Sequence, residues 1–135
     1  MSETEPAIVL VVEDELPVRL FAEEIPSEDG GYRVITAADA DEALMILKGR
    51  PEVRLVFTDI NMPGSMNGLE LAHTVQARWP GVEVLVTSGA GLSGALPSGS
   101  RFLQKPTMPR VLLAAVRDML ARAPEPVMRA PVMPI

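Results

Sequence analysis

The sequence predicts a single α/β domain in which a doubly wound parallel sheet is covered by helices on both faces. Three observations support this class. Short apolar runs rich in β-branched residues, such as 7–12 (AIVLVV), have the composition of strands buried on both faces. Segments with helical periodicity alternate with these runs, as in successive βαβ units. A length of 135 residues suits one domain of ordinary size.

The first half of the chain continues this alternation after the strand at 7–12. Gly30 and Gly31 mark a turn, and Gly49 with Pro51 marks the end of a helix. Asp14 is a candidate N-cap for the first helix, and Pro26 stands close to that helix's end. The predicted elements are a helix over 16–25, a strand over 32–37, a helix over 39–47 and a strand over 53–58.

The second half repeats the pattern with one interruption. A loop is predicted over 64–68, and Pro80-Gly81 stops the helix that follows it. The predicted elements are a helix over 69–79, a strand over 82–87, a strand over 101–104 and an amphipathic helix over 109–122. A helix belongs between the last two strands, but 89–100 (GAGLSGALPSGS) contains four Gly, three Ser and one Pro. Such a composition is poor helix material, so we expect a loop or at most one or two helical turns there.

The predicted domain therefore covers residues 7–123. Residues 1–6 form an N-terminal extension, and residues 124–135 (PEPVMRAPVMPI) form a Pro-rich tail that we expect to be flexible.

Composition excludes several classes of function. A net charge of −6 argues against a nucleic-acid binder, which is normally basic. The absence of cysteine removes disulfides, thiolate catalysis and cysteine-ligated metal sites. The acidic N-terminus does not resemble a signal peptide, and no apolar stretch approaches the roughly 20 residues that cross a bilayer. We expect a soluble, cytoplasmic protein with no membrane contact.

Reactive side chains stand where the predicted strands end. In open parallel sheets, ligands bind just beyond the carboxyl ends of the strands, so these side chains should converge at one edge. They are Glu13 and Asp14 after the first strand, Asp59 after the third, Thr87 at the end of the fourth and Lys105 after the last.

Phosphoryl transfer explains such a set. Two carboxylates about 5 Å apart repel each other by roughly 3 kcal/mol at an effective dielectric constant near 20. A hard divalent cation relieves this repulsion, and ligation by oxygen alone favours Mg²⁺. The cation screens an incoming phosphoryl group, so that a carboxylate oxygen can attack it. An ammonium group and a hydroxyl then stabilise the remaining phosphoryl oxygens.

Four motifs give these residues a family resemblance. VVEDE, FTDINMPGSMNG, VLVTSGA and FLQKP, in this order, resemble the successive signatures of the bacterial two-component response-regulator receiver (CheY-like) family. The resemblance extends over about residues 7–122. It implies a flavodoxin-like (CheY-like) fold with five parallel strands in the order 2-1-3-4-5, here with the fourth helix short or absent.

The resemblance also implies a role for each residue. Asp59 would accept the phosphoryl group, Lys105 would contact it, and Thr87 and Phe102 would be the switch residues. Mg²⁺ would be bound by Asp14, Asp59 and the main-chain carbonyl of Asn61, and by Glu13 through water. The Lys105–Pro106 peptide bond would be cis. The phosphoryl donor would be a sensor histidine kinase or a histidine phosphotransfer protein, and the output would be contact with an unidentified protein. No catalysis beyond self-phosphorylation and self-dephosphorylation is expected.

Simpler interpretations exist for each residue alone. Asp14 could be only an N-cap, Asp59 a turn residue, Thr87 an ordinary strand residue, Lys105 a surface charge and Phe102 a core residue; their joint occurrence in order favours the site. His73, the only histidine, is expected at the surface or its boundary.

Two other functions are open alternatives. A phosphatase of the haloacid-dehalogenase type needs a second Asp two residues after the nucleophile, where this chain has Asn61. A flavin-binding module needs a phosphate-cradling loop after the first strand, where Glu13-Asp14-Glu15 would repel phosphate unless a metal intervenes. A further hypothesis concerns 89–100: phosphorylation could order this segment.

Overall fold

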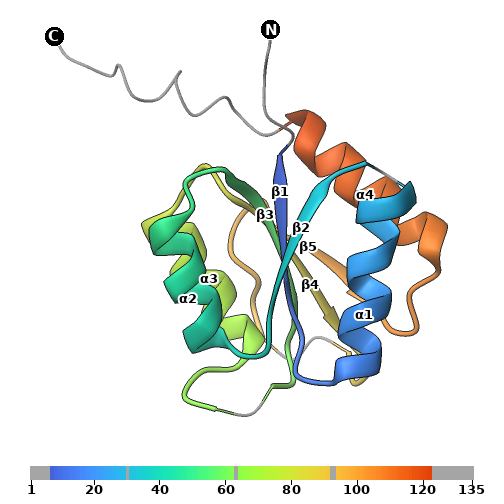
Figure 1. Cartoon of the computed structure of the whole chain (residues 1–135). Helices are drawn as coiled ribbons and strands as arrows, with labels where there is room; N and C mark the ends of the chain where they lie inside the picture. Colours follow the sequence, from blue (N-terminus) through green and yellow to red (C-terminus); the bar gives the residue numbers. More distant parts are fainter. Residues whose placement is uncertain (1–6, 30, 63, 92–93, 123–135) are drawn as a thin grey trace, which may run out of the picture.

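A five-stranded parallel sheet forms the centre of the molecule (Figure 1). The computed structural model describes residues 7–29, 31–62, 64–91 and 94–122, so the predicted extension at 1–6 and tail at 124–135 lie outside the described residues. The strands lie in the predicted order β2-β1-β3-β4-β5. Their bounds are β1 Ile8–Val12, β2 Arg33–Ala37, β3 Val53–Asp59, β4 Glu83–Ser88 and β5 Arg101–Gln104.

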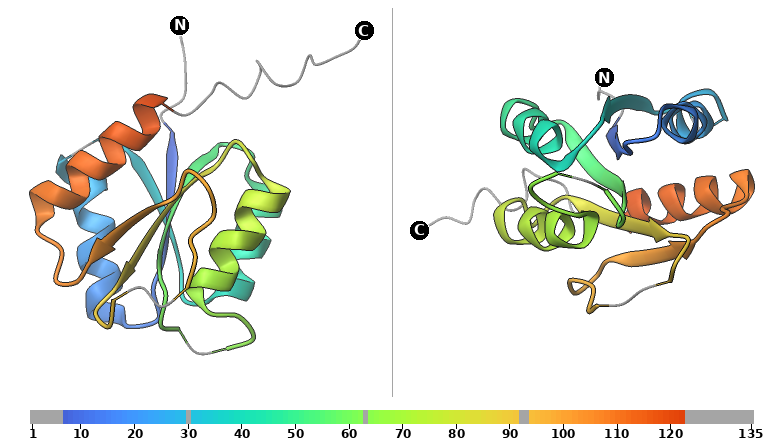
Figure 2. Two further views of the ribbon diagram at one scale, coloured as in Figure 1. Left: turned by 180° about the vertical axis from the view of Figure 1, so that it is seen from behind. Right: turned by 90° about the horizontal axis from the view of Figure 1, so that it is seen from below.

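Helices cover both faces of this sheet, as predicted. Helices α1 and α4 lie on one face, and α2 and α3 lie on the other (Figures 1 and 2). Their bounds are α1 Leu16–Glu24, α2 Ala40–Gly49, α3 Gly68–Arg78 and α4 Pro109–Arg122. None of the helices in the described ranges is both long and apolar enough to span a bilayer.

The end of the first helix differs from the prediction. The chain does not leave the helix at Ile25 but continues as a π-helical segment, η1 Ile25–Asp29. Pro26 lacks the amide hydrogen that the next α-helical bond requires, so the α-helical bonding pattern cannot continue through it. The strand predicted at 32–37 then begins one residue later, at Arg33.

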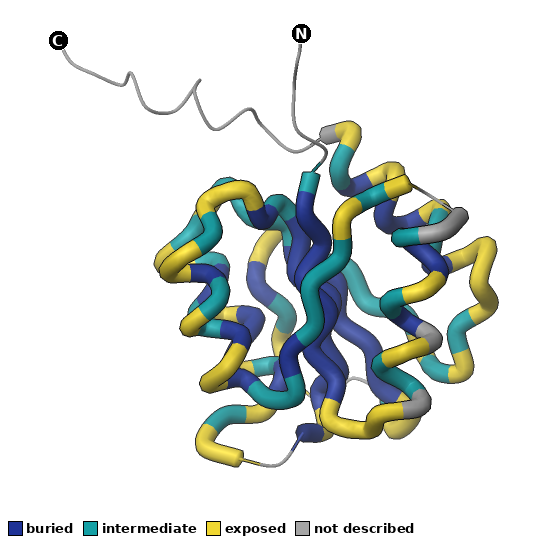
Figure 3. The backbone as a smooth tube through the Cα atoms, viewed as in Figure 1, coloured by how far each residue is buried: buried dark blue, intermediate teal, exposed yellow. Residues whose placement is uncertain are grey.

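Alternate residues of the central strands fill two aliphatic cores. Ile8, Leu10 and Val12 of β1 pack under α2 and α3, whereas Val9 and Val11 pack under α1 and α4. All five are at most 1% exposed. Figure 3 shows the central strands as buried, whereas most of the edge strand β2 is only partly buried or exposed. Burial on both faces explains why the strand patterns are continuous apolar runs.

The connection between β4 and β5 contains no helix in its described part, residues 89–91 and 94–100, as the sequence predicts. Gly91 and Gly99 each have a φ of +85°, in the left-handed region that disfavours other residues. The segment packs instead against α3. His73 Nε2 donates to the carbonyl oxygen of Ala95 at 2.8 Å, and the Gln76 amide donates to the carbonyl oxygen of Ser98. His73 is exposed, as expected.

Candidate functional site

The carboxyl ends of the strands bring the predicted residues to one edge of the sheet, opposite the ends at which the chain enters and leaves the domain (Figure 1). Asp59, the last residue of β3, pairs in register with Thr87 of β4. Glu13 follows β1 directly, and Lys105 follows β5. Carboxylate oxygens of Glu13, Asp14 and Asp59 lie within 4.8 Å of one another. The convergence predicted from the strand ends is present.

Both carboxylate oxygens of Asp59 are held by other residues of the site. The main-chain amide of Asn61 donates to Oδ1 at 3.0 Å, and Lys105 Nζ lies 2.7 Å from Oδ2. The Asp59 side chain is only 8% exposed, and that of Lys105 is 27% exposed. A partly buried ion pair with good geometry therefore holds the carboxylate in one orientation.

Glu13 is the second buried acid of the site. Its Oε1 lies 3.5 Å from Lys105 Nζ, and its Oε2 accepts a hydrogen bond from the Glu15 amide at 3.3 Å. Burial raises the pKa of Glu13 to about 7, and the negative charge of Asp59 adds to this rise. The Glu15 amide and the Lys105 charge oppose the rise without cancelling it. Near neutral pH, Glu13 therefore exists in both protonation states.

Lys105 remains the cation of the site. Burial, the largest single influence, acts to lower its pKa, but the hydrogen bond and charge of Asp59 and the charge of Glu13 together raise it. The Lys105–Pro106 peptide bond is cis, as predicted.

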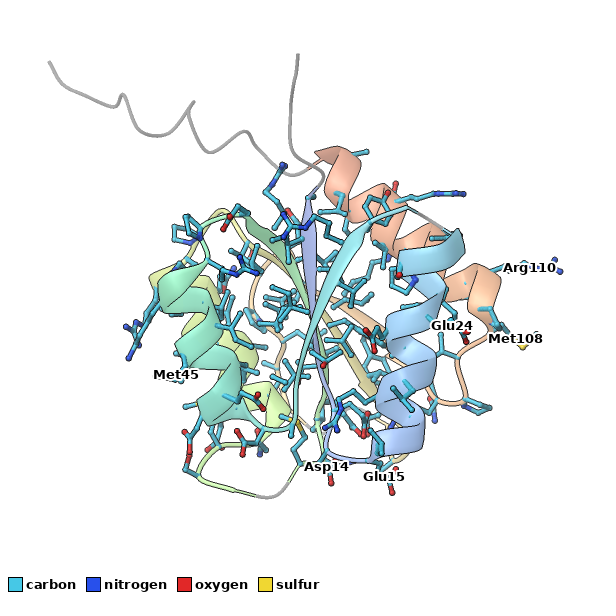
Figure 4. The ribbon with its side chains drawn as sticks, viewed as in Figure 1. Asp14, Glu15, Glu24, Met45, Met108 and Arg110 are labelled. Carbon is cyan, nitrogen blue, oxygen red and sulfur yellow. The ribbon has the colours of Figure 1, made fainter. Side chains whose placement is uncertain are left out.

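Asp14 completes the acidic cluster from an exposed position. Its side chain and that of Glu15 lie at the edge where β1 leads into α1 (Figure 4). The first bond of α1 runs from the Arg19 amide to the Glu15 carbonyl, so Glu15 and not Asp14 is at the N-cap position. An N-cap role therefore does not account for Asp14.

The donor set fits Mg²⁺. Three carboxylates from two strand ends supply only oxygen ligands, which a hard divalent cation prefers, and exposure on one side leaves room for metal-bound water. Thr87 gives a second indication that an oxygen-rich ligand fits this site. It is 3% exposed, and its Oγ1 finds no hydrogen-bond partner within the described part of the chain. A buried hydroxyl without a partner is costly, and an oxygen-rich ligand beside Asp59 would relieve it.

The turn from β3 into α3 is held tightly beside Asp59. Asn67 and Glu70 form a reciprocal capping box at the start of α3. A Cβ on Gly68 would lie 1.9 Å from the main-chain carbonyl oxygen of Asp59, so only glycine fits there. The sequence letters NGLE already carry the cap signal, whereas the close approach is visible only in three dimensions.

Sequence reasoning missed Ser88. This residue is fully buried, and its Oγ accepts hydrogen bonds from Asn61 Nδ2 and the Ala90 amide, both at 3.1 Å. The available signal was a second hydroxyl directly after Thr87 at the strand end. Phe102 is half-buried and packs against the core under α2 and α3, which is compatible with both of its predicted roles.

A cavity of about 560 Å³ opens beside the site, between α1 and the start of α4. Asp59, Thr87 and Lys105 lie on its wall, together with apolar residues of both helices such as Val18 and Leu112. The Asp59 carboxylate is therefore accessible from the side of α1.

Comparisons of sequence and structure show which known proteins this chain is similar to. A family model described as "Response regulator receiver domain" matches residues 9–117. The chain is similar to a "Chemotaxis protein CheY homolog" of Campylobacter jejuni, with 33% identity over 83% of this chain and 91% of that protein. A receiver-protein crystal structure from Sinorhizobium medicae superposes with a TM-score of 0.80 at 25% identity and covers 89% of this chain and 98% of that one.

Other relatives are longer than this chain. The hydrogenase transcriptional regulatory protein HoxA of Cupriavidus necator is 33% identical over 83% of this chain, and the match spans only 24% of HoxA. A response regulator of Synechocystis is matched over 53% of its length. Similarity to these proteins therefore concerns only part of their length.

Proposed function

This chain belongs to the response regulator receiver family, and we propose on that basis that Asp59 accepts a phosphoryl group in a Mg²⁺-dependent reaction. The observation that carries the proposal is the contact between Asp59 and Lys105. An acid at the end of β3 and an amine after β5, 46 residues apart in sequence, meet at 2.7 Å beside two further acids.

Each residue of the site would have its own role in phosphoryl transfer. An Asp59 carboxylate oxygen would attack the phosphorus of a phosphohistidine, and the histidine nitrogen would leave with the electron pair of the broken P–N bond. Lys105 Nζ, now on Asp59 Oδ2, would extend its contact to the phosphoryl oxygens and balance their charge. The cavity between α1 and α4 would admit the donor.

Asp14, Asp59 and the carbonyl of Asn61 would hold Mg²⁺, with Glu13 acting through metal-bound water. The ion would supply charge neutralisation at the phosphoryl oxygens during transfer. Burial keeps Glu13 partly protonated near neutral pH in the metal-free protein, so binding of the ion would displace that proton.

Phosphorylation would then shift the chain between two conformers. The buried hydroxyl of Thr87 would be drawn to a phosphoryl oxygen, and Phe102 would follow on the neighbouring strand. We propose a histidine kinase or a histidine phosphotransfer protein as donor, and a protein as the target of the switch. We also propose a cytoplasmic location and no turnover of external substrates.

Intact mass tests the proposal directly. After incubation with Mg²⁺ and a small phosphoryl donor, the chain should gain one base-labile phosphoryl group. The variant Asp59→Asn should gain none, because it lacks the nucleophile. The control Asp118→Asn removes an exposed acid that pairs with Arg101 far from the site, and it should behave as wild type. A phosphoryl group on Asp59→Asn would contradict the assignment, and steady hydrolysis of unrelated phosphomonoesters would favour the phosphatase alternative.

A further inference from the structure

Ser88 occupies an unusual position in the site. It is the last residue of β4 and is fully buried, yet three polar contacts meet on it. Its Oγ accepts from Asn61 Nδ2 and from the Ala90 amide, each at 3.1 Å. Its main-chain carbonyl accepts from the Lys105 amide, also at 3.1 Å.

Two of the three residues that donate to Ser88, Asn61 and Lys105, also hold the carboxylate of Asp59. Asn61 donates its amide to Asp59 Oδ1, and Lys105 places its ammonium on Oδ2. Lys105 is bound through the main chain, which any residue at position 88 would provide. Asn61 is bound through the hydroxyl, which only a few residue types would provide. The choice of serine therefore bears on Asn61.

We propose that Ser88 is a positioning residue for Mg²⁺ binding and phosphoryl acceptance, acting through Asn61. Asn61 is exposed and lies in the turn after β3. Its conformation therefore depends on the hydrogen bonds of its main-chain amide and of its side-chain carboxamide. The hydrogen bond from the Asn61 side chain to the buried Ser88 hydroxyl holds the main-chain amide of Asn61 in place against Asp59 Oδ1. The same anchor orients its carbonyl, which the proposed function makes a ligand of the ion. This inference rests on that function.

A local structural role does not account for the contact. The bond from the Ala90 amide to Ser88 Oγ is a common serine turn and stabilises the start of the β4–β5 connection without Asn61. The bond from Asn61 instead joins residues 27 positions apart, from two different strand-to-loop turns. It ties the acceptor turn to the strand that carries Thr87.

The test compares two hydroxyl deletions. Ser88→Ala removes the anchor, and Ser65→Ala removes a hydroxyl from the same β3–α3 turn that bonds to Asp41 and does not reach Asn61. In Ser88→Ala, the Mg²⁺ dissociation constant measured by calorimetry should rise about two- to ten-fold, the worth of one hydrogen bond. Phosphoryl acceptance should slow by a similar factor at low Mg²⁺ and recover at saturating Mg²⁺. Ser65→Ala should match wild type in both measurements.

A double-mutant cycle shows whether Ser88 affects Mg²⁺ binding through Asn61. Asn61→Ala keeps the main-chain carbonyl and removes the anchored carboxamide, so it should weaken Mg²⁺ binding as much as Ser88→Ala, and combining the two should add nothing. NMR of the metal-free wild type should show the Asn61 side-chain amide protons protected from exchange, and Ser88→Ala should lose this protection.

Two results would overturn the inference. One is an unchanged Mg²⁺ dissociation constant in a folded Ser88→Ala protein. The other is a full additional effect of Ser88→Ala in the Asn61→Ala background, since the hydroxyl would then act elsewhere. If Ser88→Ala does not fold, an Asn61→Ala protein with wild-type Mg²⁺ affinity overturns it equally. Failure of wild type and Ser65→Ala to accept phosphoryl groups would instead reject the proposed function, and the metal and NMR measurements would still test the anchor.

Discussion

The two sides of the site differ in how firmly they are held. On the metal side, at the ends of β1 and β3, the carboxylates of Glu13 and Asp59 each have hydrogen-bond partners, and a capping box and a close glycine contact fix the turn into α3. On the switch side, at the end of β4, Thr87 Oγ1 has no partner in the described residues. The connection that follows forms no helix in its described part and is bonded to α3 through His73 and Gln76.

This difference suits the proposed function, which requires binding at one side and movement at the other. Preorganised ligands bind an ion without reorganising, whereas a segment with few local hydrogen bonds opens or shifts at low free-energy cost. Perturbing each side of the site separately tests this contrast.

The largest effect should come from a substitution of Gly68, which contacts the main chain of Asp59 on the metal side. In Gly68→Ala, the new methyl group would meet the Asp59 carbonyl oxygen at 1.9 Å, the Asp59 carbonyl carbon at 2.6 Å and Ile60 Cα at 2.8 Å. All three are main-chain atoms, which cannot move away without distorting the turn. We expect a loss of about 3 kcal/mol or more in the free energy of unfolding, measured by urea denaturation, and a strong loss of phosphoryl acceptance. In the control Gly49→Ala, a Cβ meets nothing within 4 Å, and stability should be unchanged or slightly raised. Equal stability of both variants would show that the turn is adaptable.

A pH series should test the metal side of the site through the titration of Glu13. Its pKa is raised from 4.5 to about 7 in the folded chain. Between these values the folded chain holds a proton that the unfolded chain has lost, so metal-free stability should fall as pH rises through this window. If Mg²⁺ binds at this site as proposed, it would compete with this proton, and Mg²⁺ affinity should rise about ten-fold between pH 6 and pH 8, as calorimetry can measure.

Glu13→Gln is the control for this titration. It keeps the shape of the side chain and removes its proton equilibrium, so the stability slope between pH 4.5 and 7 should shrink and the Mg²⁺ affinity should vary less with pH. An unchanged pH dependence in this variant would assign the titration to another group.

The smallest effect should come from removing the hydrogen bonds that hold the β4–β5 connection against α3. His73→Ala and Gln76→Ala each remove one exposed bond to the β4–β5 connection, so each should cost at most about 1 kcal/mol in stability. Amide hydrogen exchange should nevertheless accelerate in residues 94–100. Thr74→Ala removes a bond that stays within α3, from Thr74 Oγ1 to the Glu70 carbonyl, and should leave this exchange unchanged.

The same exchange experiment tests whether phosphorylation orders the connection. Protection of residues 94–100 should rise when Asp59 carries a phosphoryl mimic. Equal protection with and without the mimic would reject this hypothesis, and the segment would then be a fixed part of the surface.

Much of the fold was predictable because it depends on periodicity. The central strands β1, β3 and β4 are apolar runs buried on both faces, and the alternation of strands with helices implies parallel strands. Parallel strands end at one edge, so the residues at their ends could be placed together from order alone. The glycine- and serine-rich composition of 89–100 likewise excluded a regular helix, because these residues lose too much conformational freedom in one.

Tertiary structure decided what depends on burial and on contacts between distant residues. Sequence order places Glu13 near Lys105, 92 residues away, but only packing buries this acid deeply enough to raise its pKa to about 7. The bond between Ser88 and Asn61 and the approach of Gly68 to Asp59 arise where separate turns meet, and neither has a local pattern. The sequence by itself determined which groups reach the edge of the sheet. Desolvation and cross-strand contacts, which exist only in the folded chain, determined how firmly each group is held there.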